Sequence, residues 1–500
     1  MTRTDNRTTT RTPRLLAALV AAALATGAAA CVERADESPL AGDRPDAADG
    51  SGGGARANDG TGGGTIDWEP CMGGAECAEV EVPVDYDNPD GNTLTLSVSR
   101  VPARGERIGS LFVNPGGPGG TATDFAPTIA SVMPSEITNR FDIVGVDPRG
   151  LGASDFDCGM DGEEIYGVDY SIDSPEDEEE LLDLSQEYVD GCEAAAGELL
   201  PYLGTEDVAR DIDAVREMMG DDELNYLGYS YGTAIGQMLA DLFPDRVRAM
   251  ILDGVLDLGP TGVELAVDQA AGFESALAAF EEDCDSDPSC PIAPGAHGAI
   301  EELIDRVEEE PIPASPRDLG PGELGVAMAY PLYAEFLWPD FQMAIANALD
   351  GDGTAMVNLA DQYLDGDWDI YFAVNCLDFA WPDTPEELLA EGEAAADEAP
   401  IFGEWIVNDY VRCSMWPTEA EPLEPVTAPG TPPILVVSTT NDPATPYEAG
   451  VRTAERLEEG VLLSYEGEGH TIVFNGDPCV DDVAVSYLVD LEPPEDGSTC

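Results

Sequence analysis

Residues 224–240, with the sequence LNYLGYSYGTAIGQMLA, decide the fold of this chain. Residues 224–227 have the composition of a buried strand, and residues 233–240 have that of a helix. Between them lies the G-x-S-x-G motif of residues 228–232. Glycines suit its two ends because a side chain there would crowd the neighbouring strand and helix. A simple Gly/Ser-rich turn is the alternative, but the flanking pattern favours a nucleophile elbow that presents Ser230 at a helix N-terminus.

Short apolar runs alternate with amphipathic stretches along much of the chain. Helical spacing of apolar residues predicts a helix at 205–219, and the alternating runs at 78–84 and 93–101 predict a hairpin. Strands that alternate with helices favour a parallel sheet covered by helices on both faces. The predicted strands are residues 78–84, 93–101, 111–113, 141–146, 224–227, 247–252, 434–438 and 460–465.

The pattern changes between residues 258 and 400. Helical stretches such as 266–280 and 298–307 follow one another there without clear buried strands. We therefore predict a helical cap at 258–400, inserted between core segments at 66–257 and 401–500. The predicted fold class is α/β, with a mostly parallel sheet and this inserted cap.

The N-terminus has the features of a targeting segment. Four arginines precede the apolar residues 15–26, which are too few to span a membrane comfortably, and Cys31 follows the small residues 27–30. This predicts a lipoprotein-type signal peptide over 1–31, with a lipid on Cys31 holding the protein at the extracellular face of a bacterial membrane. Ala28-x-Ala30 would also serve an ordinary signal peptidase and give a secreted protein. Residues 32–65, rich in Gly, Ala, Asp and Ser, predict a flexible linker.

The cysteine count agrees with export. Removing Cys31 from the 11 cysteines leaves ten, an even number that suits an oxidising compartment. Sequential pairing is the simplest prediction because the cysteines occur as near neighbours, although spacing alone leaves their connectivity open. The predicted pairs are Cys71–Cys77, Cys158–Cys192, Cys284–Cys290, Cys376–Cys413 and Cys479–Cys500.

The chain is strongly acidic. Its formal net charge is −80, from 21 basic and 101 acidic residues, and every basic residue is arginine. Such a charge would repel phosphate, so nucleic acid is excluded as a partner. The acidic residues are spread over the chain, which indicates a solvated surface, and we hypothesise an adaptation to high salt, where charges are screened. With only two histidines and no C-x-x-C pair, no metal site is predicted.

A serine nucleophile needs a base within hydrogen-bond reach, and the base needs an acid that orients it. His470 follows the last predicted strand and therefore faces the same sheet edge as the elbow, whereas His297 lies in a polar loop and is expected at the surface. Asp442 follows the strand at 434–438, between serine and histidine in chain order, and is the predicted acid. Asp253, at the end of another strand, is the alternative and is expected to support a turn.

An oxyanion hole requires backbone N–H donors near the developing charge. The amide of Tyr231, directly after the serine, is the first predicted donor. The second should come from the Gly-rich turn Asn114–Gly120, which follows the strand at 111–113. Gly117 is the predicted residue, and Gly116 is the alternative.

Six stretches together resemble the tripeptidyl aminopeptidase-like branch of the prolyl-aminopeptidase family of α/β-hydrolases. They occur in order over nearly all of the chain after the linker: Asn114–Gly120, Asp147–Ser154, Gly228–Gly232, Ile251–Asp257, Asn441–Pro446 and Gly469–Thr471. The resemblance implies an exopeptidase that releases short peptides or proline from a free N-terminus, with peptides as substrates and no cofactor. Pro115 stands where proline-specific members usually have histidine, which argues against proline specificity.

The resemblance also nominates a substrate-binding residue. An exopeptidase has to recognise a free α-ammonium group, for which a carboxylate in the cap is suited. Asp378 lies in Ala373–Asp378, which matches a family motif, and is the predicted residue. A carboxylic-ester hydrolase or a proline iminopeptidase with the same triad remain alternative functions, because fold alone does not separate them. A catalytically silent binding protein is disfavoured by the intact set Ser230, Asp442 and His470.

Overall fold

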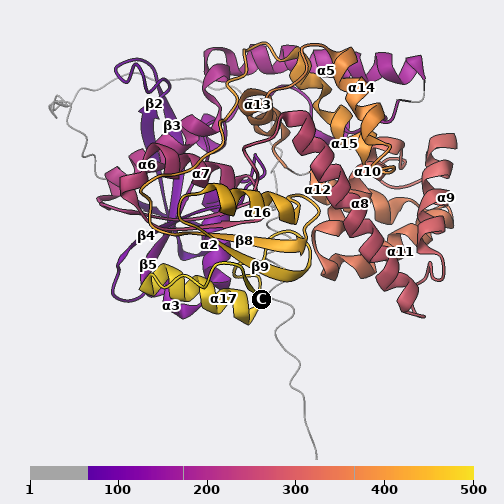
Figure 1. Cartoon of the computed structure of the whole chain (residues 1–500). Helices are drawn as coiled ribbons and strands as arrows, with labels where there is room; N and C mark the ends of the chain where they lie inside the picture. Colours follow the sequence, from indigo (N-terminus) through magenta and orange to yellow (C-terminus); the bar gives the residue numbers. More distant parts are fainter. Residues whose placement is uncertain (1–65, 173, 365) are drawn as a thin grey trace, which may run out of the picture.

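The computed structural model describes residues 66–172, 174–364 and 366–500 (Figure 1). The predicted signal peptide with Cys31 and the predicted linker at 32–65 lie outside these residues. The structural statements below therefore concern the described part of the chain.

A ten-stranded sheet forms the centre of the core, in the order β1-β2-β3-β5-β4-β6-β7-β8-β9-β10. The first three strands and the β3–β5 pair are antiparallel, and every later pair is parallel. The strands are β1 (Glu69–Pro70), β2 (Glu76–Pro83), β3 (Thr93–Val101), β4 (Gly109–Asn114), β5 (Phe141–Val146), β6 (Leu224–Tyr229), β7 (Val247–Asp253), β8 (Ile434–Asn441), β9 (Gly460–Glu468) and β10 (Ser498–Thr499). The predicted mostly parallel sheet and the β2–β3 hairpin are confirmed; the two-residue strands β1 and β10 were not predicted.

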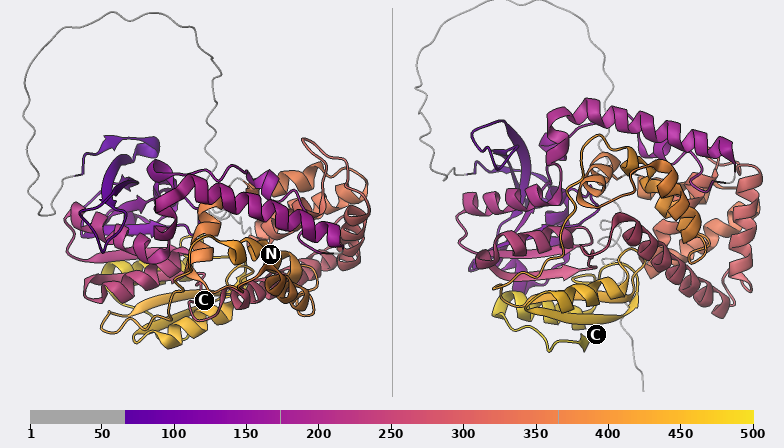
Figure 2. Two further views of the ribbon diagram at one scale, coloured as in Figure 1. Left: turned by 90° about the horizontal axis from the view of Figure 1, so that it is seen from above. Right: turned by 45° about the horizontal axis from the view of Figure 1, so that its top comes forward.

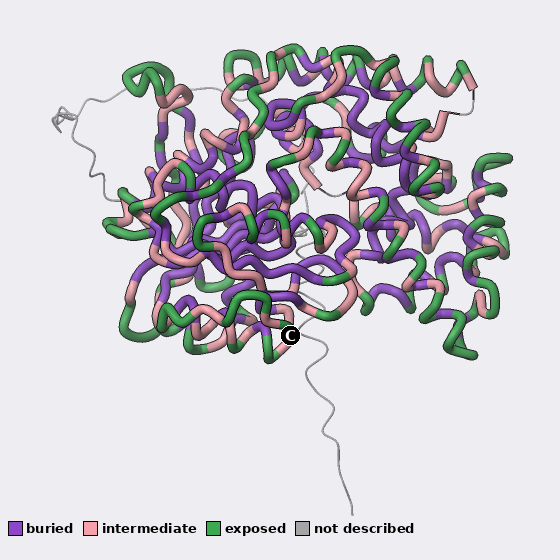
Figure 3. The backbone as a smooth tube through the Cα atoms, viewed as in Figure 1, coloured by how far each residue is buried: buried purple, intermediate pink, exposed green. Residues whose placement is uncertain are grey.

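Alternate side chains of the central strands enter hydrophobic cores on opposite faces of the sheet, as the period of two requires. In β4, Leu111 and Val113 belong to one core and Phe112 belongs to the other. The first core is covered by α2 (Ala122–Val132), α3 (Ser135–Thr138) and α17 (Pro478–Val485), and the second by α6 (Thr205–Met219), α7 (Gly232–Leu242) and α16 (Tyr447–Arg456). Figure 3 shows buried residues along the central strands and on the inner sides of the helices, with exposed residues mostly on the outside.

A helical cap lies beside the sheet (Figure 1). Seven of its helices fall in the predicted range: α8 (Gly262–Ser286), α9 (Ala296–Glu309), α10 (Pro321–Ala329), α11 (Trp338–Leu349), α12 (Thr354–Leu364), α13 (Trp368–Asp378) and α14 (Pro385–Ala395). Their buried residues join the core that α6 and α7 cover, so one continuous apolar cluster links cap and sheet.

Further segments join the cap from outside residues 258–400. They are α4 (Gly162–Ile165), α5 (Pro175–Ala196), α15 (Gly403–Asp409) and the 3₁₀ segment η7 (Tyr410–Met415). Figure 2 shows α5 running from the sheet across the cap helices, where the hydroxyl of Tyr188 donates to Asp369 Oδ1 of α13 at 2.9 Å. The helical layer over the sheet thus extends beyond the predicted limits on both sides.

Five disulfides confirm the sequential pairing predicted for the ten cysteines. They join Cys71 to Cys77, Cys158 to Cys192, Cys284 to Cys290, Cys376 to Cys413 and Cys479 to Cys500. The fourth ties α13 to η7, two parts of the cap wall described below. Within the described ranges, no helix is both long enough and apolar enough to cross a membrane.

Candidate active site

The elbow predicted at residues 228–232 is a tight turn between β6 and α7. Ser230 has a φ of 55°, a left-handed conformation that is costly for a residue with a side chain. A Cβ on Gly228 would lie 2.2 Å from the Gly232 carbonyl oxygen, and one on Gly232 would lie 2.8 Å from the Asn114 carbonyl oxygen. Glycine is therefore required at both positions, because any side chain would force the strand, the turn and the β4 loop apart.

Asp442 and His470 form a buried pair, as the order of the motifs predicts. His470 Nδ1 lies 2.9 Å and 2.8 Å from the two carboxylate oxygens of Asp442. The carboxylate is itself fixed, because Oδ1 accepts the backbone N–H groups of Ala444 and Thr445, each at 2.9 Å. This arrangement holds the imidazole with Nδ1 toward the acid and Nε2 turned away from it.

Thr445 also contacts the Asp442–His470 pair, and the sequence did not lead us to predict it. Its hydroxyl donates to Asp442 Oδ2 at 3.0 Å and lies 3.3 Å from His470 Nδ1. The signal was present, because an Asp followed three residues later by Thr is a spacing at which side chain and backbone close a local turn.

Ser230 and His470 line the same cavity, which has a volume of about 140 Å³. In the described chain, His470 Nε2 is buried and has no hydrogen-bond partner. Hydrogen bonds between a catalytic base and its nucleophile are often long without substrate and tighten when substrate binds. A free Nε2 on a residue that lines the cavity is therefore suited to accept a proton there.

The electrostatic setting of His470 favours its protonated form. Burial lowers the pKa of His470, but the charge of Asp442, the hydrogen bond to Asp442 and the charge of Asp253 together outweigh burial, so its pKa is raised above 6.5. An imidazolium at His470 would therefore be stabilised by the carboxylate of Asp442 beside it.

We predict that the acid limb of kcat/KM is centred above pH 6.5, the ordinary pKa of histidine. Only neutral imidazole accepts a proton, and a raised pKa keeps His470 protonated to higher pH. A pH–rate profile on an uncharged ester substrate measures this limb without interference from substrate ionisation. A limb centred a full unit below 6.5 would contradict the assignment of His470 as the base.

Of the two predicted oxyanion donors, Tyr231 belongs to the elbow and Gly117 belongs to the Gly-rich turn that packs against it. A Cβ on Gly116, whose φ is +93°, would lie 2.5 Å from the Tyr229 carbonyl oxygen and 3.0 Å from Tyr231 N. The N–H of Gly116 already donates to Asn114 Oδ1 at 2.9 Å. This favours Gly117 over Gly116 as the second donor, and both Gly117 and Tyr231 line the cavity.

The structure places Asp378, the substrate-binding residue predicted from the sequence, outside the lining of this cavity. Asp378 is only 3% exposed, and its carboxylate accepts the N–H of Thr205 at 3.2 Å and the Thr205 hydroxyl at 2.5 Å. That hydroxyl lies 2.8 Å from the hydroxyl of Tyr231. Asp378 thus caps the first turn of α6, whose own N-cap residue Gly204 has no side chain to do so.

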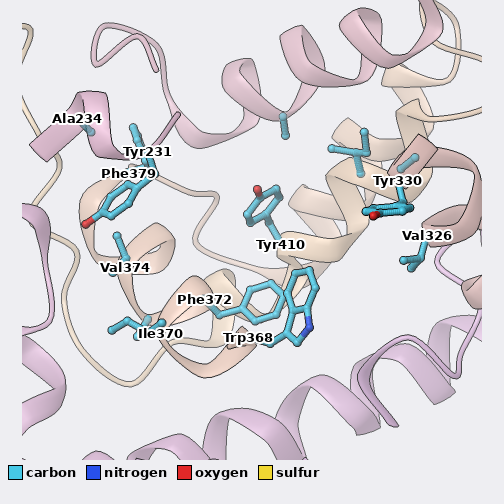
Figure 4. Packing of buried hydrophobic residues seen from close by; sticks show 14 of the residues in the cluster. Tyr231, Ala234, Val326, Tyr330, Trp368, Ile370, Phe372, Val374, Phe379 and Tyr410 are labelled. Carbon is cyan, nitrogen blue, oxygen red and sulfur yellow. The ribbon is translucent and has the colours of Figure 1, made fainter. Parts of the chain in front are cut away.

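The cap contributes an aromatic wall to the cavity. Its residues are Tyr333, Tyr363, Trp368, Tyr371 and Tyr410. The ring of Tyr333 meets the His470 ring edge to face at 5.6 Å, and the wall continues from ring to ring as far as Tyr410. Figure 4 shows the ring of Phe372 next to that of Trp368, with Tyr410 nearby; the Phe372 ring centre lies 6.3 Å from that of Trp368 and 6.5 Å from that of Tyr410.

Asp367 is the one carboxylate among the described residues that line this cavity. Its backbone carbonyl packs on the Gly-rich turn, where a Cβ on Gly119 would lie 2.4 Å away. Burial, followed by the charges of Asp369 and Asp155, raises the pKa of Asp367 to about 7, although the hydrogen bond from the Ile370 N–H opposes this. No motif marks this residue, so the sequence reasoning had no means of choosing it.

The remaining candidates lie elsewhere. His297 is exposed and pairs with Glu281 at 3.0 Å, as expected of a surface histidine. Asp253, the alternative acid, accepts backbone N–H groups of the histidine loop rather than the imidazole. Among described residues, the one group with metal-ligand spacing is Cys158, Cys192 and Asp369, but both sulfurs are already joined in a disulfide.

Comparison with known proteins agrees with this architecture. Residues 399–500 match the family model described as TAP-like protein. The chain is 36% identical over 490 residues to serine protease Hip1 of Mycobacterium tuberculosis, covering 90% of this chain and 93% of that protein. It is 35% identical to carboxylesterase B of the same species, covering 85% and 86% of the two chains. It is 30% identical to tripeptidyl aminopeptidase of Streptomyces lividans, covering 85% and 84%.

These relatives extend over nearly the whole described chain, core and cap together, at identities that establish common descent. The chain belongs to the tripeptidyl aminopeptidase-like family of α/β-hydrolases and is a serine hydrolase.

Proposed function

We propose that this protein is a serine exopeptidase that releases short peptides, tripeptides in the first instance, from the free N-terminus of peptide substrates. The observation that carries the proposal is one cavity lined by both Ser230 and His470, whose Nδ1 is held by Asp442. The relatives named serine protease and tripeptidyl aminopeptidase support a peptide substrate. A cap over the cavity suits an exopeptidase, because it limits entry to chain ends.

In the proposed mechanism, His470 Nε2 takes the proton of the Ser230 hydroxyl as Ser230 Oγ attacks the scissile carbonyl carbon. Asp442 keeps the Nδ1–H tautomer in place and stabilises the imidazolium. The tetrahedral oxyanion accepts hydrogen bonds from the N–H groups of Gly117 and Tyr231. His470 then gives its proton to the leaving amine, an acyl-enzyme forms on Ser230, and a water activated by His470 hydrolyses it.

The α-ammonium group of the substrate requires a negative partner in the cavity wall. We assign this role to Asp367, because it is the carboxylate that lines the cavity and Asp378 is engaged with Thr205. The rings of Trp368 and Tyr371 beside it offer cation–π contacts to the same ammonium.

We predict that Asp367→Asn lowers kcat/KM for peptides with a free N-terminus by roughly 10- to 100-fold, the range for losing a charged hydrogen bond. The same variant should hydrolyse an uncharged nitrophenyl ester as well as the wild type, because no ammonium is involved. Since the pKa of Asp367 is raised to about 7, we also expect the wild-type KM for free-amine peptides to rise as pH falls through 7. Asp383→Asn, at an exposed cap position, is the control, and Asp378→Asn tests the residue predicted from sequence. A larger effect in Asp378→Asn would return the role to that residue.

Parallel assays of one preparation test the proposed function against its alternatives. The substrates are a tripeptide anilide, its N-acetylated form, a proline anilide and a nitrophenyl ester. We expect the free-amine tripeptide anilide to be cleaved fastest, and the product to be an intact tripeptide. Hydrolysis of the ester alone would instead support a carboxylic-ester hydrolase, the second candidate, which the 35% identity to a carboxylesterase favours.

We further propose that the enzyme works outside the cell, held at the membrane by a lipid on Cys31, with secretion as the alternative. Five disulfides support an oxidising compartment. Mass spectrometry of the mature N-terminus decides between the two, because a lipoprotein would begin at a modified Cys31 and a secreted protein would not.

A further inference from the structure

Asp253 lies at the end of β7, between the elbow and the histidine loop. Its backbone carbonyl accepts the N–H of Ser230 at 2.9 Å. Its side-chain Oδ2 accepts the N–H groups of Ile472 at 2.8 Å and Val473 at 2.7 Å. One fully buried residue therefore holds both the backbone of the candidate nucleophile and the loop that carries the candidate base.

The loop needs such support because its backbone is strained. Thr471 and Phe474 have φ values of 62° and 60°, a left-handed conformation that side chains disfavour. The two N–H groups that Asp253 binds lie between these residues. Without an acceptor these two N–H groups would be unpaired, that of Val473 in a buried position, and nothing would offset the strain of the turn.

The end of β7 lies close to the imidazole of His470. A Cβ on Gly254, the residue after Asp253, would lie 2.9 Å from His470 Cε1. The backbone at the end of β7 thus packs directly against the imidazole, while Asp442, which follows β8, is hydrogen-bonded to its Nδ1. A shift of the backbone at Asp253 and Gly254 would change the distance between His470 and Ser230. A misplacement of about 1 Å costs on the order of 100-fold in rate.

We propose that Asp253 is a positioning residue that fixes the Ser230–His470 geometry from beneath, through its carbonyl on one side and its carboxylate on the other. This inference rests on Ser230 and His470 being the nucleophile and base proposed above. It gives a function to a carboxylate that the sequence pattern offered only as a competing acid.

The charge of Asp253 has a separate, measurable effect. Burial raises the pKa of Asp253 to about 7, against the hydrogen bonds from Val473 and Ile472, and its charge raises the pKa of His470. The titratable groups that face it are His470, Asp442 and Tyr229. Removing this charge while keeping the side-chain shape should therefore lower the pKa of His470 and move the acid limb of the rate profile to lower pH.

The test compares Asp253→Asn and Asp253→Ala with Asp481→Ala, in the full-length enzyme. Asp481 accepts the N–H of Phe474 at 2.7 Å, in the same loop. It is a matched control, because no hydrogen bond links it to the Ser230 turn. Rates are measured on a nitrophenyl ester and as labelling of Ser230 by a fluorophosphonate, so neither readout depends on peptide specificity. Ser230→Ala reports separately on the proposed nucleophile.

For Asp253→Asn we expect kcat within about fivefold of wild type and an acid limb at lower pH. For Asp253→Ala we expect kcat to fall about 100-fold with KM within threefold, because geometry rather than substrate binding is lost. Asp481→Ala should lose less than threefold. Equal losses in Asp253→Ala and Asp481→Ala overturn the proposal. If Asp253→Ala does not fold, the kcat of Asp253→Asn decides, because its amide oxygen can still accept the N–H groups of Ile472 and Val473: a kcat within about fivefold of wild type supports the proposal, and a loss of about 100-fold overturns it.

Discussion

Ser230→Ala is expected to lower kcat by about 10⁶-fold, which is the scale of loss when a triad serine is removed and water must attack unaided. The residue sits at the turn that the whole elbow is built to hold, with its left-handed φ of 55° enforced by glycines that cannot be replaced. Ser230 lines the same cavity as His470. The residual rate should come from substrate binding and the oxyanion donors alone.

Turnover of the tripeptide anilide and of the ester should fall together, because both pass through the same acyl-enzyme. Ser131→Ala, at an exposed position on α2, provides the control and should keep full activity. Retention of more than one per cent of either activity in Ser230→Ala, with no loss in labelling by a fluorophosphonate, would refute the assignment of the nucleophile.

Asp442→Asn is expected to lower kcat by about 10⁴-fold with little change in fold or KM. The carboxylate now holds Nδ1 from both oxygens, and an amide in its place would present an N–H₂ group to the same nitrogen. The imidazole would then be held with its proton on Nε2, where it cannot accept from Ser230. Activity is therefore lost because the imidazole is held in the wrong tautomer, and the packing around it is unchanged.

The contrast with Asp253→Asn makes this result specific. Both aspartates are buried and both lie at the end of a central strand, yet only Asp442 is hydrogen-bonded to the imidazole. We expect a gap of roughly three orders of magnitude between the two variants, from about 10⁴-fold against at most fivefold. Equal losses would mean that the acid had been assigned wrongly. Circular dichroism and thermal melts of both variants establish that folding is retained.

Several features of this molecule could be predicted because they are encoded locally. The strands around Ser230 were recognisable from short apolar runs, and their alternation with helices predicted the parallel sheet that the structure shows. The elbow was recognisable because a sharp strand-to-helix turn requires glycine at residues 228 and 232. Sequential disulfides were the simplest prediction because chain neighbours such as Cys71 and Cys77 lie only six positions apart in the sequence.

The cap shows where such local reasoning ends. Helical spacing identified helices between residues 258 and 400, but it contains no information about which other helices pack beside them. α5 and α15 join this layer through contacts such as Tyr188 with Asp369, which lie 181 residues apart in the chain. A boundary drawn from composition could not include them.

The choice of the proposed substrate-binding carboxylate also depended on contacts between segments that are far apart in the chain. Asp367 and Asp378 stand at the two ends of one helix, in a chain with 101 acidic residues, so neither type nor spacing distinguishes them. Their surroundings in the folded chain distinguish them. The carboxylate of Asp378 is bound by Thr205, whereas Asp367 lines the cavity.

The sequence by itself determined the sheet, the elbow and the nomination of Ser230, Asp442 and His470, and it made sequential disulfides the simplest prediction. Each of these depends on neighbours along the chain, or on an order of motifs that a parallel sheet brings to one edge. Only the tertiary structure decided that Asp253 joins the two halves of the site, that Thr445 completes the acid–base pair and that an aromatic wall with one carboxylate closes the cavity. These depend on contacts between distant segments, which form only when burial of apolar surface brings cap and sheet together.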